Sequence, residues 1–306
     1  MDREAVRMKI LLLGANGQLG LELSRTLPAL GEVMACSHVE LDITDQYSVI
    51  EVIHNFKPQV IVNAAAYTAV DQAESERNIA FKVNAEATGI LAKEAAKHDI
   101  WLIHYSTDYV FDGCKPRPYT EADSPGPINI YGESKLAGEQ IIAGSGCHHL
   151  IFRTTWVIGK DGNNFAKTVL RLATEKDSLS IINDQFGVPT SPALIARVTM
   201  SAIEAIATTR HWPVGLYHLA PHGETTWYGI AKTLLQFAED AQPSLSAGES
   251  SLQPIKTADY PTPAKRPVNS RLDTSKLEKQ LPFNLPHWRY DFFVAAEDII
   301  KSYKRA

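Results

Sequence analysis

The stretch YGESK places Tyr131 and Lys135 four residues apart. On a helix, this spacing brings both side chains to one face. A phenol can protonate a ketone oxygen while hydride reaches the carbon, but a free phenol with a pKa near ~10 is a poor donor at neutral pH. An adjacent ammonium favours the phenolate, lowers the pKa of Tyr131 and can hold the ribose hydroxyls of a nicotinamide cofactor. The pair indicates carbonyl reduction, although the same spacing occurs by chance in many surface helices.

A hydroxyl side chain precedes this pair, in the segment YSTDYVF that begins at Tyr105. Residues 101–105 read as a buried strand, so Thr107 is expected at the carboxyl edge of a parallel sheet, where ligands of doubly wound folds bind. Its hydroxyl can hydrogen-bond a substrate carbonyl and Tyr131 together.

Three glycines, Gly14, Gly17 and Gly20, follow the first predicted strand in the sequence GANGQLG. A side chain in such a turn blocks the approach of backbone N–H groups to a pyrophosphate, which binds at the positive end of the following helix. Glycine-rich turns also occur for structural reasons alone. The position at the start of a strand-helix-strand pattern favours dinucleotide binding.

The end of the second predicted strand bears on the choice of nicotinamide cofactor. A carboxylate there would bind the ribose 2′-hydroxyl and repel a 2′-phosphate, but the strand ends at Ser37 and His38, which are both donors. The sequence therefore favours NADPH and leaves NADH open, because no arginine stands there either. Asp42, just downstream, is placed to accept a hydrogen bond from the adenine amino group or to cap the helix that follows.

Short apolar runs alternate with segments of helical period in the first half of the chain. This alternation predicts an α/β fold with a doubly wound parallel sheet of the Rossmann type. The expected strands are residues 9–13, 32–36, 59–63, 101–105 and, as the sixth strand, 149–157; the expected helices are 19–30, 49–56 and 79–97.

Proline and glycine accumulate in the second half, where strands become fewer. We expect residues 1–158 to form the dinucleotide-binding domain, with 190–220 returning to it, and residues 159–306 to form mainly a smaller substrate-binding lobe. Residues 1–7 are charged and contribute neither a periodic pattern nor a core face, so we expect them to be loosely held. Met8 would serve equally well as the start.

The composition is that of an ordinary globular protein, with 306 residues, 44% hydrophobic and 21% charged, and a net charge of −5. It gives no basic surface for nucleic acid and no membrane span. The three cysteines, Cys36, Cys114 and Cys147, have no metal-ligand spacing and indicate reduced thiols in a cytoplasmic protein.

Taken together, these segments resemble the extended short-chain dehydrogenase/reductases and, within them, the family of dTDP-4-dehydrorhamnose reductases. The similarity covers almost the whole chain. It is carried by GANGQLG, NAAAYT from Asn63, VDQAE from Val70, HYSTDYVF, NIYGESKLAGE, FRTTWV, GNNFAKT and the RPVNSRL stretch from Arg266.

The resemblance implies reduction of the 4-keto group of dTDP-4-dehydro-L-rhamnose to give dTDP-L-rhamnose, with Tyr131 as proton donor and Lys135 as its partner. It also implies that Thr107 polarises the ketone and that Asp108 contacts the dTDP-sugar. The residues implied to line the cofactor are Gly17, Gln18, Leu19, Asp42, Ile43, Ala64, Ala65 and Ala66.

Further substrate contacts are expected in the second half. Trp156 either stacks on the sugar or base, or is a half-buried core residue. Arg266 and Arg271 suit a pyrophosphate, the alternative being two solvated guanidiniums. Some of these reductases bind Mg²⁺ at a dimer interface through carboxylates of the first and last helices; here Glu22, Glu297 and Asp298 lie on those helices, where carboxylates are commonly just solvated.

Three other functions would require residues or steps that differ from those of a reductase. Dehydratases of this superfamily carry an extra acid after the Thr-Asp pair, where this chain has Tyr109, so elimination is disfavoured. An epimerase would reverse the hydride step with a retained cofactor, and a non-catalytic nucleotide-binding subunit would lack Tyr131 or Lys135. His104, His148 and His149 have no ligand-like spacing and are assigned structural roles.

Overall fold

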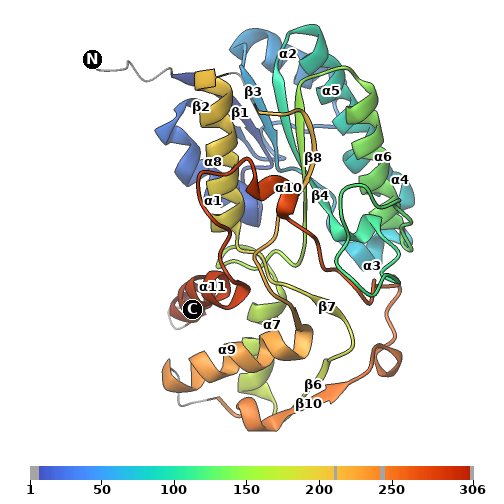
Figure 1. Cartoon of the computed structure of the whole chain (residues 1–306), viewed down its shortest axis with the longest axis vertical. Helices are drawn as coiled ribbons and strands as arrows, with labels where there is room; N and C mark the ends of the chain where they lie inside the picture. The colour runs from blue at the N-terminus through green and yellow to red at the C-terminus, as the bar shows by residue number, and fades with distance from the viewer. Residues whose placement is uncertain (1–6, 210–211, 242–244, 304–306) are drawn as a thin grey trace.

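The computed structural model describes residues 7–209, 212–241 and 245–303. The expectation about residues 1–7 therefore lies almost entirely outside the described residues. Figure 1 shows a layered α/β lobe above a smaller lobe of helices and short strands. None of the described helices is long and apolar enough to span a membrane.

The larger lobe contains six parallel strands. Their order across the sheet is β2 (Gly31–Cys36), β1 (Met8–Leu13), β3 (Val60–Asn63), β4 (Trp101–Thr107), β5 (His149–Thr154) and β8 (Gly215–His218). The order reverses at β1, with β2 on one side and β3 on the other. A crevice at the carboxyl ends of β1 and β3 is where a doubly wound sheet binds its ligand. The predicted fold class is confirmed.

Helices cover both faces of this sheet. On one face lie α1 (Gln18–Thr26) and α8 (Pro192–Thr209); on the other lie α2 (Gln46–Phe56), α5 (Ala87–Lys97) and α6 (Ile130–Gly144). Strand β1 shows why: Ile10 and Leu12 pack toward α1 and α8, whereas Leu11 and Leu13 pack toward α2 and α5. A strand buried on both faces reads as a continuous apolar run, as KILLL does.

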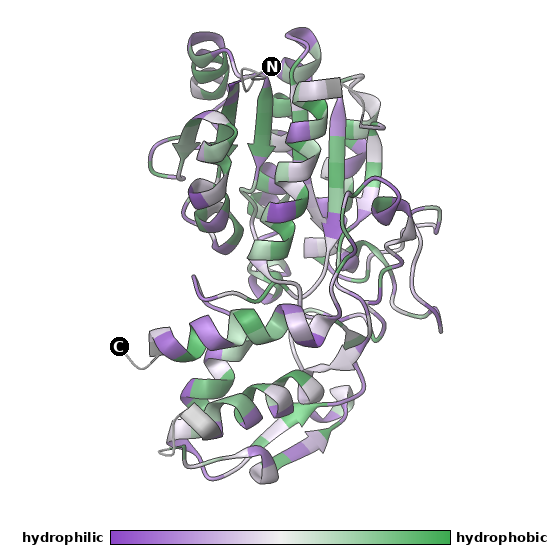
Figure 2. Ribbon diagram, turned by 60° about the vertical axis from the view of Figure 1, so that its left-hand side comes forward, coloured by the Kyte–Doolittle hydropathy of each residue, from purple (hydrophilic) through white to green (hydrophobic). Residues whose placement is uncertain are grey.

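The smaller lobe has its own hydrophobic core. Its helices are α7 (Phe165–Glu175), α9 (Trp227–Ala241) and α11 (Trp288–Tyr303). Two short sheets complete it, in which β6 (Leu179–Ile182) pairs with β10 (Leu252–Ile255) and β7 (Phe186–Gly187) pairs with β9 (Thr225–Thr226). Figure 2 shows apolar faces of these helices turned toward one another. The helix α8 and the strand β8 lie in the larger lobe, although they follow the first segments of the smaller one.

Three predicted elements differ in the structure. The helix expected over 19–30 ends at Thr26 and continues as a 3₁₀ turn, because Pro28 cannot donate to the helical ladder. The helix expected over 79–97 is α4 (Arg77–Phe81), a π-helical turn (Lys82–Glu86) and α5. The segment 149–157, expected as the sixth strand, is the fifth and ends at Thr154.

The remaining described elements are short. They are α3 (Val70–Ala73), α10 (Ser275–Glu278) and the 3₁₀ turns Leu27–Ala29, Asp108–Val110, Glu249–Ser251 and Thr257–Asp259. Trp156 has a φ of 43°, a left-handed backbone conformation that a bulky residue rarely adopts. This reversal ends β5 and turns the chain toward the smaller lobe.

A buried ion pair joins α6 to the sheet. Arg153 donates from Nε to Oε1 of Glu139 at 2.8 Å and from Nη2 to Oε2 at 2.5 Å, and both side chains are nearly inaccessible. Replacing Arg153 with Met would leave a buried carboxylate without its partner. We expect the free energy of unfolding to fall by about 3–5 kcal/mol, measured by denaturant titration.

The exposed pair of Arg171 and Glu175 on α7 provides the matched control. R171M is expected to change the free energy of unfolding by no more than about 1 kcal/mol. Equal losses in the two variants would show that burial of the Arg153 pair does not matter.

Candidate active site

The glycine loop is held against the first residues after β3. Gly14 has a φ of 76°, and a Cβ there would lie 2.5 Å from the backbone nitrogen of Ala65. A Cβ at Gly20 would lie 2.0 Å from the carbonyl oxygen of Gly14. The N–H of Ala15 donates to the carbonyl of Cys36 at 3.1 Å, which ties the loop to β2. These contacts bring the N-terminus of α1 to the crevice between β1 and β3, where its free N–H groups can bind an anion.

An open cleft of about 420 Å³ lies at this crevice. Seven of the residues predicted to bind the cofactor line it together: Gly14, Gly17, Asp42, Ile43, Ala64, Ala65 and Ala66. His38 also lines it. Sequence reasoning missed seven further lining residues, Asn16, Leu41, Thr44, Tyr67, Ile79, Lys82 and Val83.

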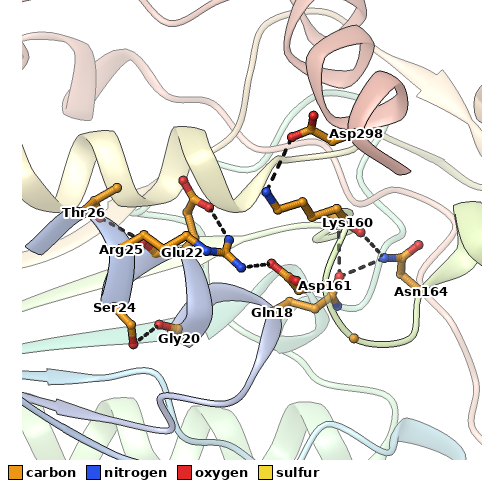
Figure 3. Close-up of polar contacts among 12 residues, drawn as sticks. Gln18, Gly20, Glu22, Ser24, Arg25, Thr26, Lys160, Asp161, Asn164 and Asp298 are labelled. Atoms are coloured by element: carbon orange, nitrogen blue, oxygen red, sulfur yellow. Dashed lines mark hydrogen bonds and ion pairs between the residues drawn. The ribbon is translucent and has the colours of Figure 1, made fainter. Parts of the chain in front are cut away.

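Six other predicted cofactor residues do not line this cleft, and two of them, Tyr131 and Lys135, are described below. Leu19 packs partly buried against the core on the α1 face, Gly20 is buried against Gly14, and Ser37 is half-buried at the end of β2. Gln18 turns to the smaller lobe, where its Oε1 accepts from Asn164 Nδ2 at 2.9 Å (Figure 3). Its side chain thus joins the start of α1 to the loop before α7.

Asp42 faces the cleft without capping a helix. Its Oδ1 accepts from the N–H of Thr44 at 2.9 Å. The cap of α2 is Asp45, whose Oδ1 accepts from the N–H of Tyr47 at 3.1 Å. Of the two roles considered for Asp42, the helix cap is therefore wrong.

The carboxylate of Glu40 lies at the end of β2. The chain turns back after Ser37, and Glu40 Oε2 accepts from the N–H of Ser37 at 2.7 Å. This hydrogen bond lowers the pKa of Glu40, so the group is ionised at neutral pH. The expectation that no acidic group lies at the strand end was wrong, because Glu40 is four residues beyond the end of β2 and returns to it only through the turn.

Tyr131 lies at the start of α6. Asn129 caps this helix by accepting from the N–H of Gly132 at 2.8 Å, so Tyr131 occupies its first turn. The phenol lies near the Thr107 hydroxyl, and its ring meets the ring of Tyr109 edge-on at 5.8 Å between centroids. Burial raises the pKa of Tyr131, and the nearby Asp108 carboxyl raises it further. The predicted lowering of this pKa is not seen in the protein without ligands.

Lys135 shows why. Its Nζ donates to the carbonyl oxygen of Tyr105 at 2.6 Å and lies 3.2 Å from Nε2 of His104. Burial lowers the pKa of Lys135 to about 8, and Glu139 opposes this shift. Both contacts of the Lys135 amino group are therefore with residues of β4.

Asp108 is buried next to Thr107, whose hydroxyl donates to Oδ1 at 3.1 Å. Burial raises the pKa of Asp108 to about 7. Its Oδ2 and the buried hydroxyls of Ser106, Thr154 and Thr155 have no hydrogen-bond partner among the described residues. Unpartnered buried polar groups at the carboxyl ends of β4 and β5 suit a polar ligand.

The predicted substrate residues of the second half are occupied by protein contacts. Trp156 is half-buried and stacks on Trp227 at 4.0 Å between ring centroids. Arg266 pairs with Asp71 through Nη2 and Oδ2 at 2.8 Å. Arg271 pairs with Glu224 at 2.6 Å. Neither guanidinium is simply solvated, and each would have to exchange or share a carboxylate to bind a pyrophosphate.

The carboxylates considered for Mg²⁺ are paired with cations of the same chain. Figure 3 shows Glu22 bonded to Arg25, at 3.1 Å, and Asp298 facing Lys160, at 3.8 Å. Glu297 pairs with Lys301 on the surface of α11. Within the described ranges, no three His, Cys, Asp or Glu side chains gather as metal ligands would. The Mg²⁺ expectation has no support.

The chain matches the family model described as "RmlD substrate binding domain" over residues 8–301. It is 46% identical to a dTDP-4-dehydrorhamnose reductase of Shigella flexneri, covering 92% of this chain and 95% of that protein. The chain belongs to the family of dTDP-4-dehydrorhamnose reductases. This confirms the predicted resemblance.

Two further relatives agree with this assignment to the dTDP-4-dehydrorhamnose reductase family. The enzyme of Burkholderia thailandensis is 42% identical and covers 96% of this chain and 99% of its own. The solved structure from Bacillus anthracis, a complex with NADP, has a TM-score of 0.86 and 33% identity, with 95% and 99% of the two chains covered.

Proposed function

We propose that this chain reduces the 4-keto group of dTDP-4-dehydro-L-rhamnose with a reduced nicotinamide dinucleotide, giving dTDP-L-rhamnose. The observation that carries the proposal is the position of Tyr131. Its phenol meets the Thr107 hydroxyl at the carboxyl end of β4, on the sheet edge that also carries the glycine-lined cleft. The choice of substrate follows the names of the related enzymes, which are dTDP-4-dehydrorhamnose reductases.

The cofactor would be held by the amides at the start of α1 and by the cleft walls around Asp42 and Ala65. When bound, it supplies the hydride. The Thr107 hydroxyl would turn from Asp108 Oδ1 to donate a hydrogen bond to the ketone oxygen, and Tyr131 would transfer its phenolic proton to that oxygen as negative charge develops there. Burial keeps Tyr131 protonated at neutral pH, which is the form that a proton donor needs. Lys135 then returns a proton to the phenolate.

The dTDP-sugar would contact the predicted substrate residues at and after the carboxyl ends of β4 and β5. Asp108, with one buried carboxyl oxygen unpartnered, would bind a sugar hydroxyl. Trp156 presents a flat ring already fixed by Trp227, so stacking on it would cost little side-chain entropy. Arg266 and Arg271 would bind the pyrophosphate oxygens.

The proposal is tested by incubating the purified protein with reduced cofactor and dTDP-4-dehydro-L-rhamnose, and by identifying the product by NMR. We expect stoichiometric cofactor oxidation and formation of dTDP-L-rhamnose. A sugar epimerised without net cofactor oxidation would favour an epimerase, and binding without any conversion would favour a non-catalytic subunit.

The cofactor preference depends on Glu40. A 2′-phosphate would seek the Ser37 amide that Glu40 already occupies, and the two anions would repel each other. Replacing Glu40 with Gln is therefore expected to raise the ratio of kcat/KM for NADPH to that for NADH on the order of tenfold.

Glu32 is the matched control for this change, because it lies at the opposite end of β2 in an exposed pair with Lys9. The cofactor ratio should not change in E32Q. An unchanged ratio in E40Q would show that the Glu40 carboxylate does not reach the ribose site.

A further inference from the structure

A buried row of polar side chains runs beneath the candidate site. Asn63 and His104 are register partners on the adjacent strands β3 and β4, so their side chains lie on the same face of the sheet. Asn63 Nδ2 lies 3.1 Å from His104 Nδ1, and His104 Nε2 lies 3.2 Å from Lys135 Nζ. All three side chains are almost completely inaccessible, with exposures of 1%, 0% and 2%.

The hydrogen bond from Ala65 to Asn63 sets the direction of the other hydrogen bonds in this row. The N–H of Ala65 donates to Asn63 Oδ1 at 3.2 Å, which leaves the amide nitrogen of Asn63 to face the imidazole. An amide nitrogen only donates, so His104 Nδ1 must accept. A neutral imidazole that accepts at Nδ1 carries its proton on Nε2 and donates it there.

Lys135 is the last residue of this row, and its Nζ faces the Nε2–H of His104. An N–H of His104 aimed at Nζ is matched by the lone pair of a neutral amine, whereas an ammonium has only donors. The neutral amine can still donate to the Tyr105 carbonyl. An ammonium would force His104 to accept at Nε2 and to turn an N–H toward the donor of Asn63.

We propose that Asn63 and His104 are positioning residues that disfavour the ammonium form of Lys135 and thereby make it a stronger acid toward the Tyr131 phenolate. After Tyr131 has given up its proton, a more acidic Lys135 returns one more readily. This catalytic consequence rests on the proposed function, but the protonation state of Lys135 in the free protein does not.

The other charged groups near Lys135 leave this effect in place. Glu139, on the same helix, favours the ammonium, but both of its oxygens bind Arg153 of β5. Burial lowers the pKa of Lys135 to about 8 and holds the pKa of His104 well below its ordinary value, so the imidazole stays neutral. Tyr131, from the first turn of the same helix, stays protonated.

Two variants reverse the direction of the row in different ways. In N63D, a carboxylate accepts from His104 Nδ1 and leaves Nε2 to accept from the ammonium. In H104Q, an uncharged amide can turn its oxygen to Lys135, so the effect does not depend on an added charge. Asn84 is the control site: it is equally buried and bonds Tyr67 and Ser134 instead of His104, so N84D adds a buried acid outside the row.

The test is an NMR titration of the ligand-free protein with lysine labelled at Cε, where the Lys135 signal is the one missing from K135M. We expect Lys135 to titrate well below the exposed lysines. Its acid dissociation constant should fall at least about tenfold in N63D and in H104Q, and should stay near the wild-type value in N84D.

The proposal is overturned if Lys135 titrates alike in wild type, N63D and H104Q, or if N84D shifts it as much as N63D does. The alkaline limb of the pH profile of kcat/KM should move upward with the NMR midpoint in N63D and H104Q. If the NMR shift is seen but the protein turns over no keto-sugar, the effect of Asn63 and His104 on Lys135 is supported and the proposed function is contradicted.

Discussion

Replacing Tyr131 with Phe is expected to lower kcat by about 10²–10⁴-fold, the range over which a positioned general acid accelerates a reaction. The substitution removes only the hydroxyl that meets Thr107, and the ring keeps its edge-on contact with Tyr109. The hydride step would then leave an alkoxide without a proton donor. Steady-state turnover with the keto-sugar nucleotide and reduced cofactor measures the effect.

Two controls separate this chemical effect from a structural one. Tyr47 on α2 is 78% exposed, and Y47F should retain full activity. The affinity of Y131F for the cofactor, measured by fluorescence titration, should be close to that of the wild type. A loss of less than about tenfold in kcat would mean that another group protonates the ketone.

The second large effect is expected at Gly20. A Cβ there would lie 2.0 Å from the carbonyl oxygen of Gly14, and this neighbour is backbone, so G20A must displace the start of α1. Moving those amides removes charge-assisted hydrogen bonds to the pyrophosphate, each worth about 1.5–3 kcal/mol. We expect cofactor affinity to fall about a hundredfold or more, with a lower midpoint of thermal unfolding.

Gly17 serves as the comparison within the same loop. A Cβ at this position would lie 3.4 Å from the Gly14 carbonyl oxygen, an ordinary van der Waals contact, and Gly17 is exposed. G17A should therefore fold with an unchanged midpoint of thermal unfolding, and any loss of cofactor affinity would report the approach of the pyrophosphate itself. Equal destabilisation in G17A and G20A would contradict the backbone clash at Gly20.

The layered sheet could be predicted from the sequence because its strands are buried on both faces and read as continuous apolar runs, as residues 9–13 do. The π-helical turn at Lys82–Glu86 could not be predicted in this way. It places Asn84 between Tyr67 and Ser134, which are distant in sequence, and those hydrogen bonds depend on the assembled fold. The helical periodicity of residues 79–97 predicts one continuous helix and gives no sign of the π-helical turn.

The small lobe was predicted as a substrate-binding lobe poor in strands, without the bounds of its elements. Its strands β7 and β9 have two residues each, too short for an alternating pattern to be read. The paired state of Arg266 was also beyond sequence reasoning, because Asp71 lies almost two hundred positions away in the chain.

Within the site, motifs predicted the residues that contact ligands better than the residues that support them. The glycine loop and the Tyr131 pair have spacings that carry their own chemistry. Glu40 and His104 gave no such signal: Glu40 reaches the end of β2 only through a turn, and His104 meets Lys135 only once β4 and α6 are packed. Their roles depend on neighbours that are not close in sequence.

The most direct test of the proposed reduction follows hydride from the cofactor to the sugar. Cofactor deuterated at the nicotinamide carbon that gives hydride would be incubated with dTDP-4-dehydro-L-rhamnose and the wild-type protein, and the product analysed by NMR and mass spectrometry. Reduction at the ketone predicts dTDP-L-rhamnose with deuterium at carbon 4 of the sugar and an equal amount of oxidised cofactor. Label at any other carbon, or no transfer by a protein that binds both ligands, would contradict it.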